Sequence, residues 1–285
     1  MSTSFKATLA LLATVFIWAY MAVVARGLVT VISPLIVLFY RLLIASVFFL
    51  PFFIKNRSWK KPYFKELILI SLGSTVNLTF FLIGLKYTSA SVSQLIYAAM
   101  PILILMYGRL INNEKQTPGK IAGVMLGFLG LMIIGISSAL EKGETITGSL
   151  SGNIIIFIAM LGWTTYLINS KNLSKSFTPI EMGSTSVLVS FFVSIVIIIF
   201  DQFSFRSNFY LNINQFFALF YIGFAGTFLT YILYQFAIRY SSPLKVSLAS
   251  YIQPVVTTIM AMFLLGEKLT FNFITGSLLI MTGVF

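Results

Sequence analysis

The side chains that usually carry out catalysis are scarce in this chain. Its 285 residues include no histidine and no cysteine, and its seven acidic residues fall in loops or at the ends of apolar stretches. Zinc and haem sites built on histidine or cysteine, thiol chemistry and disulfides are therefore excluded. Acid–base and nucleophilic catalysis also lack their usual groups inside the apolar stretches. We predict that the protein is not an enzyme and has no catalytic residues, metal or cofactor.

Hydroxyl groups instead recur inside the apolar stretches at helical spacing. Ser93 and Tyr97 lie four residues apart, and Ser250, Tyr251 and Pro254 share one face of another helix. Polar groups are costly against lipid, so we expect both faces to meet protein or a wet cavity. They are our first choice for the walls of a binding cavity. Hydrogen bonding between helices is the alternative.

A second pair of helix faces adds an amide and aromatic rings. Asn77 and Phe81 share one face, and Thr230, Tyr231 and Tyr234 share another. These groups offer hydrogen bonds and ring surfaces but no formal charge. We expect them to complete the cavity that the two hydroxyl-bearing faces begin.

Two tryptophans, Trp18 and Trp163, lie well inside apolar stretches, although tryptophan usually prefers the membrane interface. They indicate aromatic walls for an apolar or cationic group, with core filling as the alternative. The candidate substrate-binding residues are Trp18, Asn77, Phe81, Ser93, Tyr97, Trp163, Thr230, Tyr231, Tyr234, Ser250 and Tyr251.

Backbone irregularity and one buried charge are also predicted. Pro101 and Pro254 each remove a hydrogen bond to a carbonyl four residues earlier, so we predict hinges there, with plain packing kinks as the alternative. Arg41 is the formal charge placed well within an apolar stretch. It either receives a substrate carboxylate or, as we favour, plays a structural role by pairing with carbonyls or reaching the interface.

The elements that must position these residues are membrane helices. Hydrophobic residues make up 58% of the chain and charged residues 9%, against roughly 45–50% and about 25% in soluble proteins. Lipid leaves backbone groups no outside partner, and the apolar runs are too long for barrel strands, so we predict an all-α integral membrane protein. Ten stretches are long enough to span the bilayer: 7–25, 33–54, 67–85, 88–108, 118–137, 150–168, 178–200, 215–237, 243–265 and 270–285.

The charge distribution sets the expected orientation. The net charge of +12 is typical of cationic membrane loops in so apolar a chain, and it does not indicate nucleic acid. With the amino end inside, most lysines and arginines fall in inner loops, so we predict a multi-pass protein of the bacterial inner membrane with both termini cytoplasmic. We expect the first stretch to be an uncleaved anchor. The last stretch ends early, and we expect a short carboxyl-terminal end beyond it.

The chain repeats itself. One constant offset superposes Gly73 on Gly226, and the same offset relates Pro101 to Pro254. A slightly smaller offset relates the two tryptophans. We predict two five-helix copies, residues 1–140 and 148–285. Because five is odd, each helix of the second copy crosses in the opposite sense to its mate, which is the inverted repeat recurrent in secondary transporters.

The repeated motifs resemble a known family. The run from Tyr251 to Pro254, the turn Gly266–Leu269 and the spaced Gly276 and Gly283 are similar to the signature of EamA-type proteins in the drug/metabolite transporter superfamily. The first half repeats it more loosely at Asn113–Lys115. The resemblance covers nearly the whole chain. It implies a carrier that exports or imports amino acids or other small metabolites, and a positioning role for the glutamates of the two turns.

We therefore predict a ten-helix carrier in which two inverted repeats surround a central cavity. The expected cargo is a small neutral, zwitterionic or cationic metabolite, amino acids first, because the polar faces carry no cluster of arginine or lysine for phosphates. No carboxylate is embedded deep in a helix, so proton coupling lacks its common relay. We expect a monomer or weak homodimer in the lipid bilayer. A channel and a non-transporting structural or lipid-handling protein are the alternatives.

Overall fold

The computed structural model describes residues 2–111, 117–140, 148–200, 211–248, 251–266 and 271–282, and every regular element in these ranges is helical. Eight stretches of them are long and apolar enough to cross a membrane. Five are single helices, namely α1 (Thr3–Val31), α2 (Pro34–Asn56), α3 (Phe64–Leu85), α7 (Leu150–Leu173) and α8 (Pro179–Phe200). The prediction of an all-α membrane protein is confirmed.

The other three spans are assembled from consecutive helices. They are α4 (Ala90–Tyr97) with α5 (Met100–Ile111), then α10 (Ile213–Gly223) with the π-helix η2 (Phe224–Leu229) and α11 (Thr230–Tyr240), then α12 (Pro243–Leu248) with α13 (Ile252–Leu265). Sequence alone predicted a span over residues 88–108 with a hinge or a packing kink at Pro101, and in the structure the helix breaks at Ala98 and Ala99. Pro101 lacks the N–H that would continue the ladder to Tyr97.

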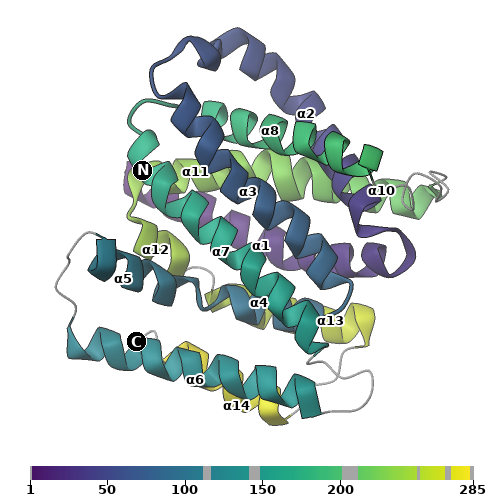
Figure 1. Ribbon diagram of the computed structural model, residues 1–285, viewed down its shortest axis with the longest axis vertical. Helices are drawn as coiled ribbons and strands as arrows, with labels where there is room; N and C mark the ends of the chain where they lie inside the picture. Colours follow the sequence, from purple (N-terminus) through teal and green to yellow (C-terminus); the bar gives the residue numbers. More distant parts are fainter. Residues whose placement is uncertain are drawn as a thin grey trace.

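Two more helices coincide with the remaining apolar stretches, α6 (Pro118–Leu140) and α14 (Phe271–Thr282). They pack against each other. In Figure 1 this pair lies at one edge of the molecule, and α4, α5, α12 and α13 lie between it and the larger group that contains α1, α2, α3, α7, α8 and α11. The short 3₁₀ helix η1 (Ser58–Lys60) joins α2 to α3.

Helix boundaries follow from capping residues in the sequence. Ser89 accepts a hydrogen bond from the Val92 amide at the start of α4, and Ser149 accepts one from the Gly152 amide at the start of α7. Proline occupies the first position of α2 and of α8, where a missing N–H costs nothing. These caps satisfy amide groups that lipid cannot.

A close contact joins α3 to α7 through glycine. A Cβ atom added to Gly73 would lie 2.8 Å from the carbonyl oxygen of Gly162, and one added to Gly162 would lie 2.7 Å from that of Gly73. Only residues without a side chain allow two backbones to approach this closely. The contact brings the middle of α7 against the middle of α3, and both helices carry candidate site residues there.

Cationic side chains hold two helix ends. Arg26 of α1 donates from Nη1 to the carbonyl oxygens of Leu85 (2.6 Å) and Lys86 (2.7 Å), at the end of α3. Lys171 of α7 donates from Nζ to the carbonyl oxygens of Ile238 (3.0 Å), Arg239 (3.0 Å) and Ser241 (2.5 Å), at the end of α11. A cation there satisfies free carbonyls and complements the helix dipole.

Candidate functional site

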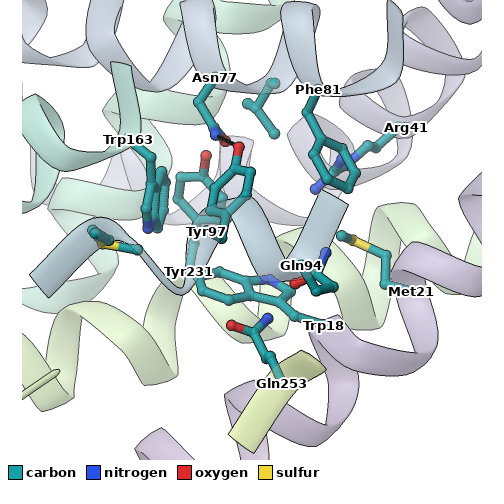
Figure 2. Close-up of a pocket in the computed structure, with 12 residues that line it drawn as sticks. Trp18, Met21, Arg41, Asn77, Phe81, Gln94, Tyr97, Trp163, Tyr231 and Gln253 are labelled. Carbon is teal, nitrogen blue, oxygen red and sulfur yellow. Dashed lines mark hydrogen bonds between the residues drawn. The ribbon is translucent and has the colours of Figure 1, made fainter. Parts of the chain in front are cut away.

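A small cavity lies in the middle of the helix bundle, near the midpoints of α1 and α7. Its volume is about 50 Å³, which is space for about three water-sized groups. Eight helices contribute to its wall, and Figure 2 shows side chains from them around the site. The lining residues are Trp18, Met21, Arg41, Asn77, Leu78, Phe81, Gln94, Tyr97, Met100, Trp163, Tyr231 and Gln253.

Aromatic rings from both halves of the chain pack around this cavity. The ring centroids of Trp18 and Trp163 lie 5.3 Å apart in a T-shaped arrangement. Tyr234 packs behind both, 4.9 Å from Trp18 and 5.2 Å from Trp163. Nε1 of Trp18 donates to Thr230 Oγ1 at 2.9 Å and to the Gly226 carbonyl at 3.1 Å. The Trp18 ring is thereby fixed against the helices η2 and α11.

The α3 side of the cavity is a hydrogen-bonded network. Nδ2 of Asn77 donates to the Tyr97 hydroxyl and, at 3.1 Å, to the Ala159 carbonyl. The Tyr97 ring lies edge-on to Phe81, with centroids 5.9 Å apart. The Tyr231 hydroxyl is 2.6 Å from Ser74 Oγ. These bonds hold two phenol groups at the cavity wall in fixed positions.

Arg41 is buried against the π-helix. Its side chain is 3% exposed, and its Nε donates to Thr227 Oγ1 at 2.7 Å. Thr227 in turn donates to the Ile222 carbonyl at 2.8 Å, five residues earlier. Short π-helical segments are found frequently at functional sites. From sequence we favoured a structural role in which Arg41 pairs with carbonyls or reaches the interface, and in the structure its Nε bonds to a threonine hydroxyl while the residue also lines the cavity.

Two larger clefts open at one end of the molecule. A cleft of about 460 Å³ separates α5, α7 and α12, and we call it the α5–α7–α12 cleft. Another of about 320 Å³ lies between the start of α1, the end of α11 and the start of α12. At the opposite end α1, α4 and α13 are packed together, where Val23, Ala90 and Ala261 form a buried apolar cluster. There the Thr257 hydroxyl donates to the Ala19 carbonyl at 3.3 Å.

The model of the EamA-like transporter family matches residues 5–136 and 150–285. The chain belongs to this family. An uncharacterized transporter of Archaeoglobus fulgidus is 25% identical over 98% of this chain and 96% of its own length. The uncharacterized transporter YoaV of Bacillus subtilis is 26% identical with the same coverage. A WAT1-related protein of Arabidopsis thaliana, At3g30340, is 26% identical over 86% of this chain and 76% of its own length.

A solved crystal structure shares the fold. It aligns with a TM-score of 0.71 and 15% identity over 98% of this chain and 94% of its own. The relatives' names and the family together make this EamA-like chain a multi-pass membrane transporter of the drug/metabolite superfamily. The resemblance inferred from the repeated motifs is confirmed.

The structure brings together more than half of the candidate binding residues. Those that line the cavity of this EamA-like chain are Trp18, Asn77, Phe81, Tyr97, Trp163 and Tyr231. Thr230 and Tyr234 lie one layer behind, in contact with Trp18. Ser93 is fully buried and donates to the Ala90 carbonyl of its own helix at 2.7 Å. Tyr251 is buried but is not among the lining residues, and Ser250 falls outside the described residues.

Sequence reasoning missed two glutamines that line the cavity, Gln94 of α4 and Gln253 of α13. Both lie inside apolar stretches, which was the signal used to select the serines. Met21, Leu78 and Met100 were also missed, and nothing in an apolar stretch marks such residues as lining a cavity.

The two prolines occupy different local positions. Pro101 is the second residue of α5, directly after the break at Ala98 and Ala99. Pro254 lies in the first turn of α13, where its missing N–H interrupts no ladder within that helix. Hinge motion at either proline stays a prediction.

Proposed function

We propose that this protein is a secondary transporter that moves a small organic metabolite by alternating access between two inverted five-helix halves, residues 1–140 and 148–285. Helix packing supports the repeat. Each of α2 and α6 packs against its repeat mate, α8 and α14 respectively. Other contacts occur twice, once in each orientation of the repeat. For example, α3 packs against α7, and their repeat mates α11 and α1 pack against each other. A two-fold axis in the membrane plane would give this pattern.

The cationic helix caps also support the repeat. The offset that relates the two tryptophans relates Arg26 to Lys171, and the offset that relates the two prolines relates Leu85 to Ile238. Arg26 donates to the carbonyl of Leu85, and its repeat mate Lys171 donates to the carbonyl of Ile238, the repeat mate of Leu85. The two interactions lie at opposite ends of the molecule, as inverted copies require.

One observation supports alternating access most directly. The cluster of Val23, Ala90 and Ala261 closes one end of the molecule. The repeat mates of these residues all line the α5–α7–α12 cleft at the other end. They are Ile168, Pro243 and Gly108, respectively. Equivalent positions are therefore packed on one side and separated on the other, which is the arrangement of a carrier open to one side only.

The cavity is smaller than a metabolite in this conformation. About 50 Å³ admits one polar group, so binding of a whole cargo requires the walls to separate. The break between α4 and α5 lies beside the lining residues Tyr97 and Met100 and provides a point at which α5 can move. Our first cargo candidates are amino acids, within a class of neutral, zwitterionic or cationic metabolites.

Membrane placement completes the proposal. The cleft end carries the amino terminus of α1 and the cationic residues Lys171 and Lys245. We assign this end to the cytoplasm of a bacterium by the positive-inside rule, with both termini there and the chain in the inner membrane.

The test is counterflow in proteoliposomes. Vesicles that contain the purified protein and an unlabelled amino acid mixture are diluted into each labelled amino acid in turn. Transient accumulation above the level of protein-free vesicles is expected for at least one member of the panel. No flux for amino acids or for a broad metabolite panel would refute a carrier. Ionic current across a planar bilayer, without saturable counterflow, would favour the channel. Neither current nor counterflow would favour a structural role.

A further inference from the structure

The central cavity contains an unneutralised positive charge. Arg41 is 3% exposed, lies in the membrane-spanning α2 and lines the cavity. Its Nε is bonded to Thr227, but no residue that the structure describes accepts a hydrogen bond from its two terminal nitrogens. Guanidinium stays charged at any physiological pH, and most of its N–H groups are on those terminal nitrogens. Figure 2 shows the side chain entering the site next to Phe81.

No counter-charge is available among the described residues that surround Arg41. None of the lining residues is acidic. Within the described ranges, Glu66 is exposed at the start of α3, and Glu181 is ion-paired with Lys61 at 2.7 Å. A buried charge without a partner is costly in a membrane protein, and such residues mark substrate or ion pathways. An anionic group is the ligand that would remove this cost.

Two amides add further unused hydrogen-bonding capacity. The side chains of Gln94 and Gln253 are 3% and 7% exposed, and neither has a hydrogen bond to any described residue. Gln94 comes from α4 in the first proposed repeat and Gln253 from α13 in the second, and both face the cavity that Arg41 lines. Aromatic rings from α1, α3, α7 and α11 surround these groups with apolar surface, and a charged hydrogen bond is stronger in surroundings of low dielectric constant.

We propose that the cargo carries a carboxylate and that the terminal nitrogens of Arg41 bind it. This inference rests on the proposed transport function and narrows its cargo class. The planar guanidinium matches a carboxylate through two parallel hydrogen bonds. Within that class, zwitterionic amino acids satisfy the requirement, whereas amines, amides and esters leave the charge unpaired. The present cavity volume fits the carboxylate, and the rest of the cargo enters the space that opens around it.

The first test compares matched probes on the wild-type protein. Thermal shift in detergent is measured with L-leucine and L-leucinamide, and with L-phenylalanine, L-phenylalaninamide and phenethylamine. We expect a dose-dependent rise in the unfolding midpoint for at least one acid and none for its amide or amine. Equal shifts for acid and amide would overturn the proposal. An equal shift from sodium chloride alone would also overturn it, because Arg41 would then be a site for an inorganic anion.

The second test changes the charge. Arg41→Gln should weaken binding of the responsive acid at least tenfold, and Arg41→Lys should weaken it less because the charge remains. Gln94→Glu places a carboxylate in the same cavity and should also abolish acid binding. Lys65→Gln is the matched control, since Lys65 is an exposed cation at the start of α3. Unchanged acid affinity in Arg41→Gln would overturn the proposal, and where this variant does not fold, the acid and amide comparison on wild type decides.

The two proposals fail in different ways. Absence of counterflow for every metabolite refutes transport, and the proposal that Arg41 binds a cargo carboxylate fails with it. Counterflow of amines and amides as fast as that of the matching acids, with Arg41→Gln unimpaired, refutes only the carboxylate assignment.

Discussion

At the scale of single residues, the cavity provides its own optical probe. The chain has three tryptophans, of which Trp18 and Trp163 line the cavity and Trp59 is 41% exposed in η1. A cargo bound between Trp18 and Trp163 should change tryptophan fluorescence saturably. We expect Trp59→Phe to retain the whole change and Trp18→Phe with Trp163→Phe to lose it. Retention of the change in the double variant would place binding elsewhere.

Side-chain length explains which site residues could be predicted from sequence. Ser93 was selected for its spacing, but a serine can satisfy its hydroxyl on its own helix, and Ser93 does so at Ala90. A glutamine cannot do this as easily, so Gln94 was the better indicator of a polar space. The aromatic residues Trp18 and Trp163 were found because tryptophan usually prefers the membrane interface, so a pair in mid-span is unusual. Arg41 was noticed, and only its surroundings reveal that part of it is unbonded.

At the scale of helices, the contact between α3 and α7 depends on two glycines. Gly73→Ala would place a methyl group 2.8 Å from the backbone oxygen of Gly162, and backbone cannot move aside as a side chain can. We expect a loss of about 1–3 kcal/mol in stability, seen as a lower unfolding midpoint in detergent. Gly27→Ala in α1 is the control, because its new methyl group meets nothing within 4 Å. That variant should be neutral or slightly more stable.

The two cationic helix caps should each stabilise a helix end. Lys171→Met removes three hydrogen bonds to the end of α11, and Arg26→Met removes those to the end of α3. We expect each change to lower the stability by about 1–2 kcal/mol, measured by thermal unfolding. Lys175→Met removes a nearby exposed cation and should have little effect. Equal effects of Lys171→Met and Lys175→Met would show that charge number, and not the cap, matters.

Helix positions could be predicted from sequence because a membrane fixes both length and composition of a span. The eight qualifying spans lie on eight of the apolar stretches. The π-helix η2 was not predicted, and its Thr227 bonds to Arg41 of a distant helix, a contact that the sequence pattern does not show. Pro101 predicted an interruption in this span, but the sequence did not show that the helix would break at Ala98 and Ala99, before the proline. Local interruptions are set by tertiary contacts that the pattern of apolar residues does not record.

At the scale of the whole molecule, the proposed repeat would relate the packed end to the end that carries the cleft. The sequence predicts that the two ends are equivalent, and the structure holds them in different states, with an apolar cluster at one and a cleft of about 460 Å³ at the other. No sequence pattern can choose between two arrangements of the same contacts. The choice depends on the small free-energy difference between conformations, which a bound cargo is able to change.

Cysteine pairs can test whether the two ends open in turn. The natural chain has no cysteine, so introduced pairs are the only thiols. Val23→Cys with Ala261→Cys joins residues of the packed cluster and should form a disulfide readily and stop counterflow. Gly108→Cys with Ile168→Cys joins the mates across the cleft and should cross-link only when that end closes. We expect a transported amino acid to change the rate of the second reaction and a non-transported one to leave it unchanged. Cross-linking of the cleft pair with counterflow preserved would mean that this cleft is not the route, and alternating access between these two ends would be wrong.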